Sequence, residues 1–355
     1  MVSEDELGEG SDDEDDGEPG LADAAYVPSS KQFKKVDDLP DPTLSNRRPP
    51  VLRLRPVRII GSSGSHHLTS FASCGDYVAV GSHHLRVYNV DDHSEQGPVL
   101  LWDQKEMGLD VKSKDPRITA LCFRPVLDEG ETARYLWCGS KDGHLWEVDV
   151  WGAAVIQTRS HCHPSPITQI YKYKQSTLTL DDTGKACLFT MNEGGSFNIN
   201  VPTQNLRIAE RQTFTTLLGH QLWTASGPIS TSSSIKSAAS RGPTIRVYEP
   251  FDDSPLGPGG RVLSVPDTVT GAVTSATIIP SKPHLVYIGH EGGHVSIWAR
   301  DTFVCISVLK ISTSAIISLA GVGSKLWAGT RKGVVNVYDV ESRPWTITNL
   351  WKAHE

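Results

Sequence analysis

The sequence lacks any run of about 18 apolar residues, the length that a membrane-spanning helix requires, so a transmembrane segment is not expected. Its N-terminus is acidic, whereas a secretory signal begins with basic residues and continues with apolar ones. There is no C-x-x-C pair and no N-x-[ST] sequon, and the six cysteines lie far apart. Scattered thiols of this kind indicate a reducing compartment and not a disulfide framework. We therefore expect a cytoplasmic protein.

Two common catalytic signatures are also missing. The chain contains neither the G-x-x-x-x-G-K-[ST] loop that cradles nucleotide phosphates nor the G-x-S-x-G turn that presents a nucleophilic serine. These absences argue against nucleotide hydrolysis and serine-esterase chemistry. The sequence implies no cofactor and identifies no catalytic residue.

Negative charge is concentrated at the N-terminus. Residues 1–20 hold ten carboxylates and no Lys or Arg, so the formal charge of −7 for the whole chain becomes +3 for the remainder. Residues 1–50 contain few large apolar groups, and such a segment cannot bury enough surface to offset its ordering entropy. We predict a disordered tail over residues 1–50, first acidic and then basic, and one folded domain over residues 51–355.

A repeated pattern runs through this domain: an apolar strand, small residues, a tight polar turn, and a second strand that ends in an aromatic residue. The clearest copies are Tyr135–Trp146, Leu285–Trp298 and Leu326–Tyr338, and weaker copies end at Tyr88, Phe189 and Tyr248. Gly143 and Gly333 supply the positive φ that a tight hairpin needs. A further strand is expected ahead of most copies, at Ile118–Phe123, Ile167–Tyr173, Phe214–Leu218, Val273–Ile279 and Ala315–Ala320. The pattern predicts an all-β fold.

The spacing of the closing aromatics indicates which all-β fold. They recur about every 40–60 residues, and one blade of a WD40-type propeller takes roughly 40–45 residues. We assign the longer gaps to insertions over residues 91–116, 194–210 and 226–242. A four-stranded blade hides little area alone, so such blades stack radially.

The repeats resemble WD40 β-propellers over roughly residues 51–355. The Trp-Asp pair of that family is degraded, for example to Trp146-Glu147, and its Gly-His element survives only around His163 and His354. WD40-like propellers usually have seven blades. Six copies followed by Ala353-His354 therefore predict a seven-bladed propeller that is cut short in its last blade, and closure with six blades is the alternative.

Two stretches, Ile118–Pro125 and Tyr135–Glu147, are similar to the N-terminal propeller of fungal and plant inositol polyphosphate 5-phosphatases. The resemblance implies a non-catalytic scaffold or targeting domain that precedes a phosphatase domain. The W-x-G-D-x-N-x-R and P-x-W-C-D-R-[IV] stretches of that catalytic domain are absent, so no active-site residue is carried over. Whether the parent protein is an enzyme depends on this resemblance alone. The alternative is a stand-alone cytosolic WD-repeat adaptor of a multiprotein complex.

The candidate interaction face consists of the turns between the second and third strands, which should all open on one face of the disc. Their basic residues are His83, His84, Lys141, Lys185, Arg241, His290, Arg331 and Lys332. A ring of cations focuses positive potential and attracts anions. The sequence thus predicts docking of an acidic protein or an anionic phosphoinositide headgroup, with peripheral membrane contact. Nucleic acid is not expected, because the charge is small and no stacking platform accompanies it.

Two histidine-rich motifs suggest metal binding, but their context argues against it. The run His290-Glu291-Gly292-Gly293-His294 matches H-E-x-x-H, which binds zinc when it lies on a helix. Its two adjacent glycines disfavour a helix, and the other repeats have a hairpin turn there. In His161-Cys162-His163, neighbouring strand residues point to opposite faces and rarely chelate one ion. We therefore predict no metal site.

Overall fold

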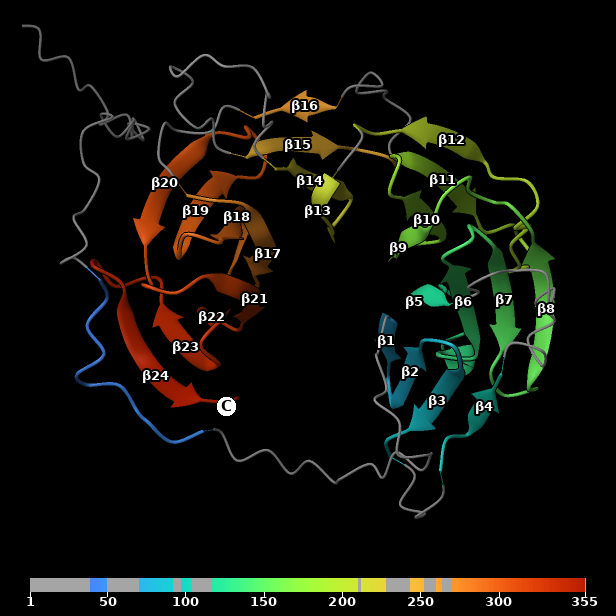
Figure 1. Cartoon of the computed structure of the whole chain (residues 1–355), viewed down its shortest axis with the longest axis horizontal. Coiled ribbons are helices and arrows are strands. Elements are labelled where there is room, and N and C mark those ends of the chain that lie inside the picture. The colour runs from blue at the N-terminus through green and yellow to red at the C-terminus, as the bar shows by residue number, and fades with distance from the viewer. Residues whose placement is uncertain are drawn as a thin grey trace, which may run out of the picture. The chain divides into compact units, whose positions relative to one another are not determined.

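The computed structural model describes residues 39–49, 70–91, 97–103, 117–209, 212–227, 243–251, 260–263 and 270–354. These residues form six four-stranded antiparallel sheets. The sheets surround a common centre like the blades of a propeller (Figure 1), so the predicted fold is confirmed. Among the same residues, no helix has the length and apolar character needed to span a bilayer. The predicted acidic tail lies largely outside the described residues.

Each sheet is a simple meander from an inner to an outer strand, and we number the blades in chain order. Blade 1 contains β1 (Ser70–Cys74), β2 (Tyr77–Gly81), β3 (Leu85–Asn89) and β4 (Leu100–Trp102). Blade 2 contains β5 (Ile118–Phe123), β6 (Tyr135–Ser140), β7 (Leu145–Asp149) and β8 (Ala154–Arg159), with a 3₁₀ turn at Glu129–Glu131. Blade 3 contains β9 (Ile167–Tyr173), β10 (Ser176–Asp181), β11 (Lys185–Thr190) and β12 (Gln204–Arg207).

The second half of the disc repeats this plan. Blade 4 contains β13 (Gln212–Leu218), β14 (Gln221–Ser226), β15 (Thr244–Tyr248) and β16 (Arg261–Val262). Blade 5 contains β17 (Val273–Ile279), β18 (Lys282–His290), β19 (His294–Ala299) and β20 (Cys305–Lys310). Blade 6 contains β21 (Ile316–Val322), β22 (Lys325–Thr330), β23 (Val334–Asp339) and β24 (Thr346–Lys352).

The predicted inner strands are confirmed, but two predicted insertions are wrong in part. The stretch 91–116 contains β4, and the stretch 194–210 contains β12. Each supplies the outermost strand of its blade. Most of 226–242 lies outside the described residues. β4 has only three residues, and β12 has four that are mostly polar, so neither is long enough or apolar enough to show the repeated pattern of the inner strands.

The hairpin glycines have the conformation that their turns require. Gly143 has φ 76° and Gly333 has φ 74°. A Cβ atom at Gly143 would collide with the backbone carbonyl of His163, and one at Gly333 would collide with that of His354. Glycine is needed there both for the positive φ and for the close approach of the next loop.

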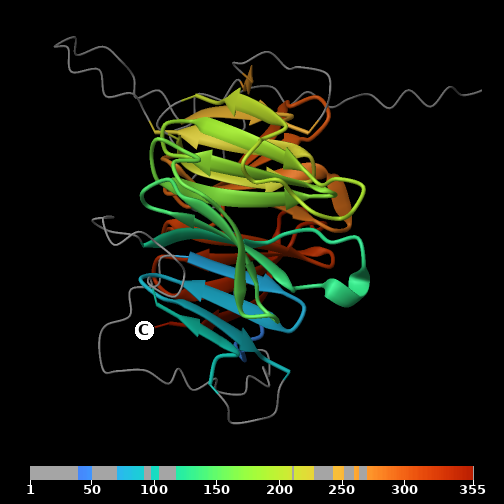
Figure 2. The same ribbon diagram turned by 90° about the vertical axis from the view of Figure 1, so that its right-hand side faces the viewer.

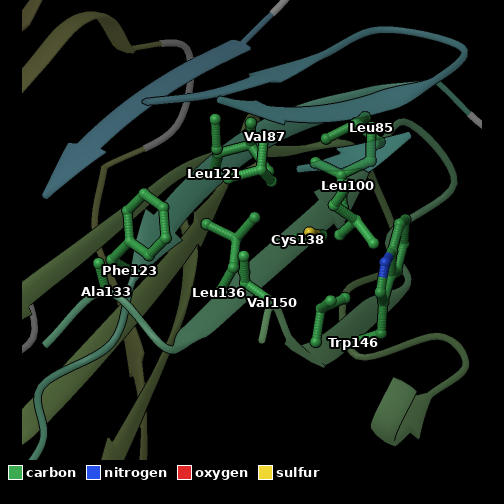
Figure 3. Packing of buried hydrophobic residues seen from close by; sticks show 13 residues of the cluster. Leu85, Val87, Leu100, Leu121, Phe123, Ala133, Leu136, Cys138, Trp146 and Val150 are labelled. Carbon is green, nitrogen blue, oxygen red and sulfur yellow. The ribbon is translucent and has the colours of Figure 1, made fainter. Parts of the chain in front are cut away.

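In the part of the chain that the structure describes, five clusters of buried apolar side chains join successive blades. Leu85, Val87 and Leu100 of blade 1 pack against Leu121 and Leu136 of blade 2, and Figure 3 shows this junction. Comparable clusters join blades 2 and 3, 3 and 4, 4 and 5, and 5 and 6. Among the described residues, no such cluster joins blade 6 to blade 1.

One position in the second strand of each blade shows how blade 6 differs from the other five. In blades 1 to 5 its side chain lies in the junction with the next blade and is at most 2% exposed. The residues at this position are Ala79, Trp137, Leu178, Trp223 and Tyr287. Trp137 makes edge-to-face contacts with Phe189 and Phe197 of blade 3, with ring centroids 5.2 Å apart in both pairs. The equivalent Trp327 of blade 6 is only partly buried, and its aromatic partner is Trp351 of its own blade.

A short N-terminal segment pairs with the outer edge of blade 6. Asn46 forms an isolated parallel bridge with Asn349 of β24. The Asn46 amide donates to the carbonyl of Thr348 at 2.9 Å, and the Leu350 amide donates to the carbonyl of Asn46 at 2.9 Å. Residues that the sequence assigns to the tail therefore contact the propeller.

His290 is a buried neutral group, and this corrects its assignment as a cation of the interaction face. Its side chain is fully buried at the end of β18, and Nε2 lies 2.7 Å from the Ser296 hydroxyl. That hydroxyl also accepts a hydrogen bond from Trp298 Nε1 at 2.9 Å. Burial lowers the pKa of His290 to about 4. Gly292 and Gly293 form a turn, so the H-E-x-x-H match is a hairpin, as predicted, and not a zinc-binding helix.

Replacing Trp137 by Ala should destabilise the fold far more than replacing Trp327. Loss of a fully buried tryptophan costs about 3–5 kcal/mol, whereas a half-covered one should cost less than about 2 kcal/mol. Urea denaturation of Trp137→Ala and Trp327→Ala, compared with wild type, measures both. Equal losses of unfolding free energy in the two variants would contradict the conclusion that Trp327 of blade 6 is not covered by a further blade as Trp137 is.

The buried imidazole should make stability fall as the solution is acidified. Unfolded His290 takes up a proton near its ordinary pKa of 6.5, but the folded form does so only near 4. The neutral His290 therefore makes its full contribution to the free energy of unfolding above pH 6.5. Up to about 3 kcal/mol of this free energy is lost as the pH falls towards 4. Urea denaturation between pH 7 and 4 should show a shallower decline for His290→Gln than for wild type. The exposed-site control His84→Gln should follow wild type, and parallel curves for all three proteins would refute this account.

Candidate functional site

The turns between the second and third strands of the blades share one face of the disc. In a four-stranded antiparallel meander these turns alternate with the inner and outer turns, so they open on the same side in every blade. Seen edge-on (Figure 2), the strands run across the disc and the turns lie at its two faces. We call the surface formed by residues 82–84, 141–144, 182–184, 291–293 and 331–333 the turn face.

The segment that follows the outer strand of a blade is hydrogen-bonded to the turn of the same blade. The His163 amide donates to the carbonyl of Gly143 at 3.0 Å, and the Ile311 amide donates to that of Gly293 at 3.1 Å. In blade 6 the Ala353 amide donates to the carbonyl of Gly333 at 2.8 Å. The backbone of the turn face is therefore held at fixed positions.

The structure brings most of the predicted cations to this face. His83, His84, Lys141, Arg331 and Lys332 are exposed there.

The remaining predicted residues differ from this group. Lys185 is partly buried, and its ammonium group donates to the carbonyl of Cys162 at 2.7 Å. His290 is buried, and Arg241 lies outside the described residues.

Carboxylates on the same face reduce its positive field. Arg331 Nη2 lies 3.0 Å from Glu291 Oε1, which joins the turns of blades 5 and 6. Both side chains are largely exposed, and pairs of this kind contribute only about 0–1 kcal/mol to stability. The charges of the turn face are therefore mixed, with cations and carboxylates on neighbouring turns.

Beneath the turn of blade 3 lies a buried polar network that the sequence analysis missed. His163 Nδ1 lies 3.1 Å from Asp181 Oδ2, and His163 Nε2 lies 2.7 Å from the Thr179 hydroxyl. The second oxygen of Asp181 accepts hydrogen bonds from the backbone amides of Thr183 and Lys185. All three network side chains are buried. The network locks the turn and the loop before β9 to each other.

Two cysteines complete this network. Cys162 precedes His163 in the loop, and Cys187 lies on β11 opposite Thr179. One ligand atom from each of Cys162, His163 and Cys187 lies within 4.8 Å of the other two. The Cys162 thiol donates to the sulfur of Cys187, which is the main reason that the pKa of Cys187 lies below its ordinary value. Of the described residues, these three form the only such His/Cys/Asp/Glu group.

The comparisons with known proteins agree with this architecture. No family model matches the chain. It is 28% identical over 340 residues to the probable inositol polyphosphate 5-phosphatase of Schizosaccharomyces pombe. The alignment covers 94% of this chain but 26% of that protein, so the chain spans about a quarter of this curated relative.

Solved structures support the fold. A chain in the crystal structure of a mitotic checkpoint complex matches with a TM-score of 0.56 and 13% identity, over 81% of either chain. Sqt1 from Chaetomium thermophilum matches with a TM-score of 0.56 and 16% identity, over 81% of this chain and 71% of Sqt1. The chain is thus an all-β propeller of the WD40 type, and in sequence it resembles an inositol polyphosphate 5-phosphatase.

Proposed function

We propose that the propeller is the non-catalytic targeting and protein-interaction part of an inositol polyphosphate 5-phosphatase. The observation that carries this proposal is the sequence similarity over 94% of the chain to a fraction of the S. pombe protein. A domain that matches only 26% of such an enzyme can be a separate module within it. The polar groups of the blade 3 network are engaged with one another in the interior, which suits a structural role.

The turn face is the surface through which we propose that the module docks. Lys141, Arg331 and Lys332 present positive charge on a backbone that the neighbouring loops hold in place. Phosphate and carboxylate groups are the anions that such a surface attracts. The proposed ligand is an anionic phosphoinositide headgroup or an acidic segment of a partner protein. Docking would hold the phosphatase near a membrane that carries its substrate.

The alternative is a stand-alone adaptor in a cytoplasmic complex. It is favoured by the fold similarity to a chain of the mitotic checkpoint complex. The full-length transcript distinguishes the two functions. A phosphatase domain encoded with the propeller supports the first, and an open reading frame without one supports the second.

Charge reversal on the turn face should weaken binding to anionic vesicles. Each basic residue near such a surface contributes about 1 kcal/mol, so Lys141→Glu, Arg331→Glu and Lys332→Glu together should reduce affinity by at least about tenfold. Co-sedimentation with phosphatidylcholine vesicles, with or without phosphatidylinositol 4,5-bisphosphate, measures this effect.

The matched control places three reversals on the opposite face. Lys174 lies in an inner turn, Lys282 follows the inner turn of blade 5, and Arg343 lies in the outer turn of blade 6. Lys174→Glu, Lys282→Glu and Arg343→Glu together should bind vesicles like wild type. Equal losses in both triple variants would contradict a specific turn face. Phosphate release from inositol polyphosphates by the purified chain would contradict the non-catalytic role.

A further inference from the structure

The cluster Cys162, His163 and Cys187 combines two sulfur donors and one imidazole at the junction of blades 2 and 3. The residues come from two elements, the loop before β9 and strand β11. All three are fully buried. We propose that these side chains form a binding site for one thiophilic d¹⁰ metal ion, zinc(II) or copper(I). Two thiolates with imidazole are the ligands that these ions select over oxygen donors.

The spacing of the donor atoms fits such an ion. Zinc lies about 2.3 Å from thiolate sulfur and about 2.0–2.1 Å from imidazole nitrogen, which places ligand atoms in a tetrahedral site roughly 3.5–3.8 Å apart. Here the three donor atoms lie within 4.8 Å of one another. Contraction around an ion therefore needs shifts of about 1 Å or less, within the reach of side-chain torsions.

The orientation of His163 is that of a metal ligand with an outer-shell carboxylate. Asp181 Oδ2 lies 3.1 Å from Nδ1 and can accept its proton, which leaves the lone pair of Nε2 free to accept or to ligate. Ligating histidines commonly donate their other nitrogen to a carboxylate, which fixes both the tautomer and the ring. Asp181 is itself held by the amides of Thr183 and Lys185.

The Thr179 hydroxyl makes the contact with His163 Nε2 that a bound ion would replace. Its hydroxyl lies 2.7 Å from His163 Nε2 and 3.4 Å from the carbonyl oxygen of Cys187. When Nε2 binds an ion, the hydroxyl can rotate and donate to that carbonyl. No buried donor is then left unpaired.

Charge balance also suits a buried ion. A divalent ion with two thiolates is neutral, and the adjacent Lys185 ammonium can offset the Asp181 carboxylate, whereas copper(I) with two thiolates leaves one further negative charge, so the balance is better for zinc(II). That ammonium lies 2.7 Å from the carbonyl of Cys162. A buried cluster without net charge avoids the desolvation cost of an unpaired ion.

Metal content of the purified chain tests the proposal. After incubation with zinc under reducing conditions and desalting, wild type should hold about one zinc per chain by mass spectrometry. Cys162→Ser and Cys187→Ser should each hold less than about a tenth as much. The control Cys305→Ser changes a partly buried thiol on β20 of blade 5 and should retain about one. Parallel loading with copper(I) under anaerobic conditions shows which of the two ions is held more tightly in competition.

Two further readouts separate a metal site from a purely structural network. The variant Thr179→Val removes the hydroxyl that competes with the ion for His163 Nε2. This variant should retain one zinc per chain. Asp181→Asn should weaken zinc binding by about 10–100-fold, the usual cost of losing an outer-shell partner.

Cobalt(II) substitution gives a result that does not depend on any variant folding. Wild type should then develop the sulfur-to-cobalt charge-transfer absorption of a thiolate site. Absence of that absorption together with a failure of wild type to retain either zinc or copper(I) would overturn the proposal, as would zinc retention by Cys162→Ser/Cys187→Ser equal to that of wild type.

Discussion

A β-sheet with apolar side chains on both faces cannot be hidden by a single neighbour, and this requirement organises the whole molecule. Each blade covers one face of the blade before it and offers its other face to the blade after it. The equivalent side chains Trp137 of β6 and Tyr287 of β18 lie on the side of their blade that the next blade covers. The core of the described residues is consequently divided into five clusters, and each junction depends mainly on the two blades that form it.

The polar interior follows from the same geometry. Where a loop crosses from one blade to the next, its backbone must pass under the turn of the previous hairpin, and buried donors there need partners. In blade 3 His163 and Asp181 supply them, and in blade 5 His290 and Ser296 form a shorter version with Trp298. The turn face is therefore supported from below by hydrogen bonds that solvent does not reach. Loop side chains can vary there without loss of the framework, which suits a surface that recognises partners.

The sequence predicts the inner strands well because they carry a strong local pattern. Ile118–Phe123, Ile167–Tyr173 and Val273–Ile279 are all observed with the predicted bounds. The outer strands β4 and β12 were not predicted, because β4 has only three residues and β12 has four that are mostly polar, which is too short a stretch to show an alternating pattern.

The candidate site was less predictable. His290 has the sequence of a polar turn, yet strand β18 extends far enough to bury it. The proximity of Cys162 to Cys187 depends on the pairing of β10 with β11 and on the path of the loop before β9, and no local motif encodes it.

The bridge between Asn46 and Asn349 has a consequence for the order of events during synthesis. The junctions between blades involve segments that follow one another along the chain, so each can form soon after its second blade leaves the ribosome. Asn46 is made before any blade, but its partner strand β24 is made after all the others. The N-terminal segment therefore cannot form this pairing until β24 has been made. The bridge between Asn46 and Asn349 can therefore form only after the strands of all six described blades have been made.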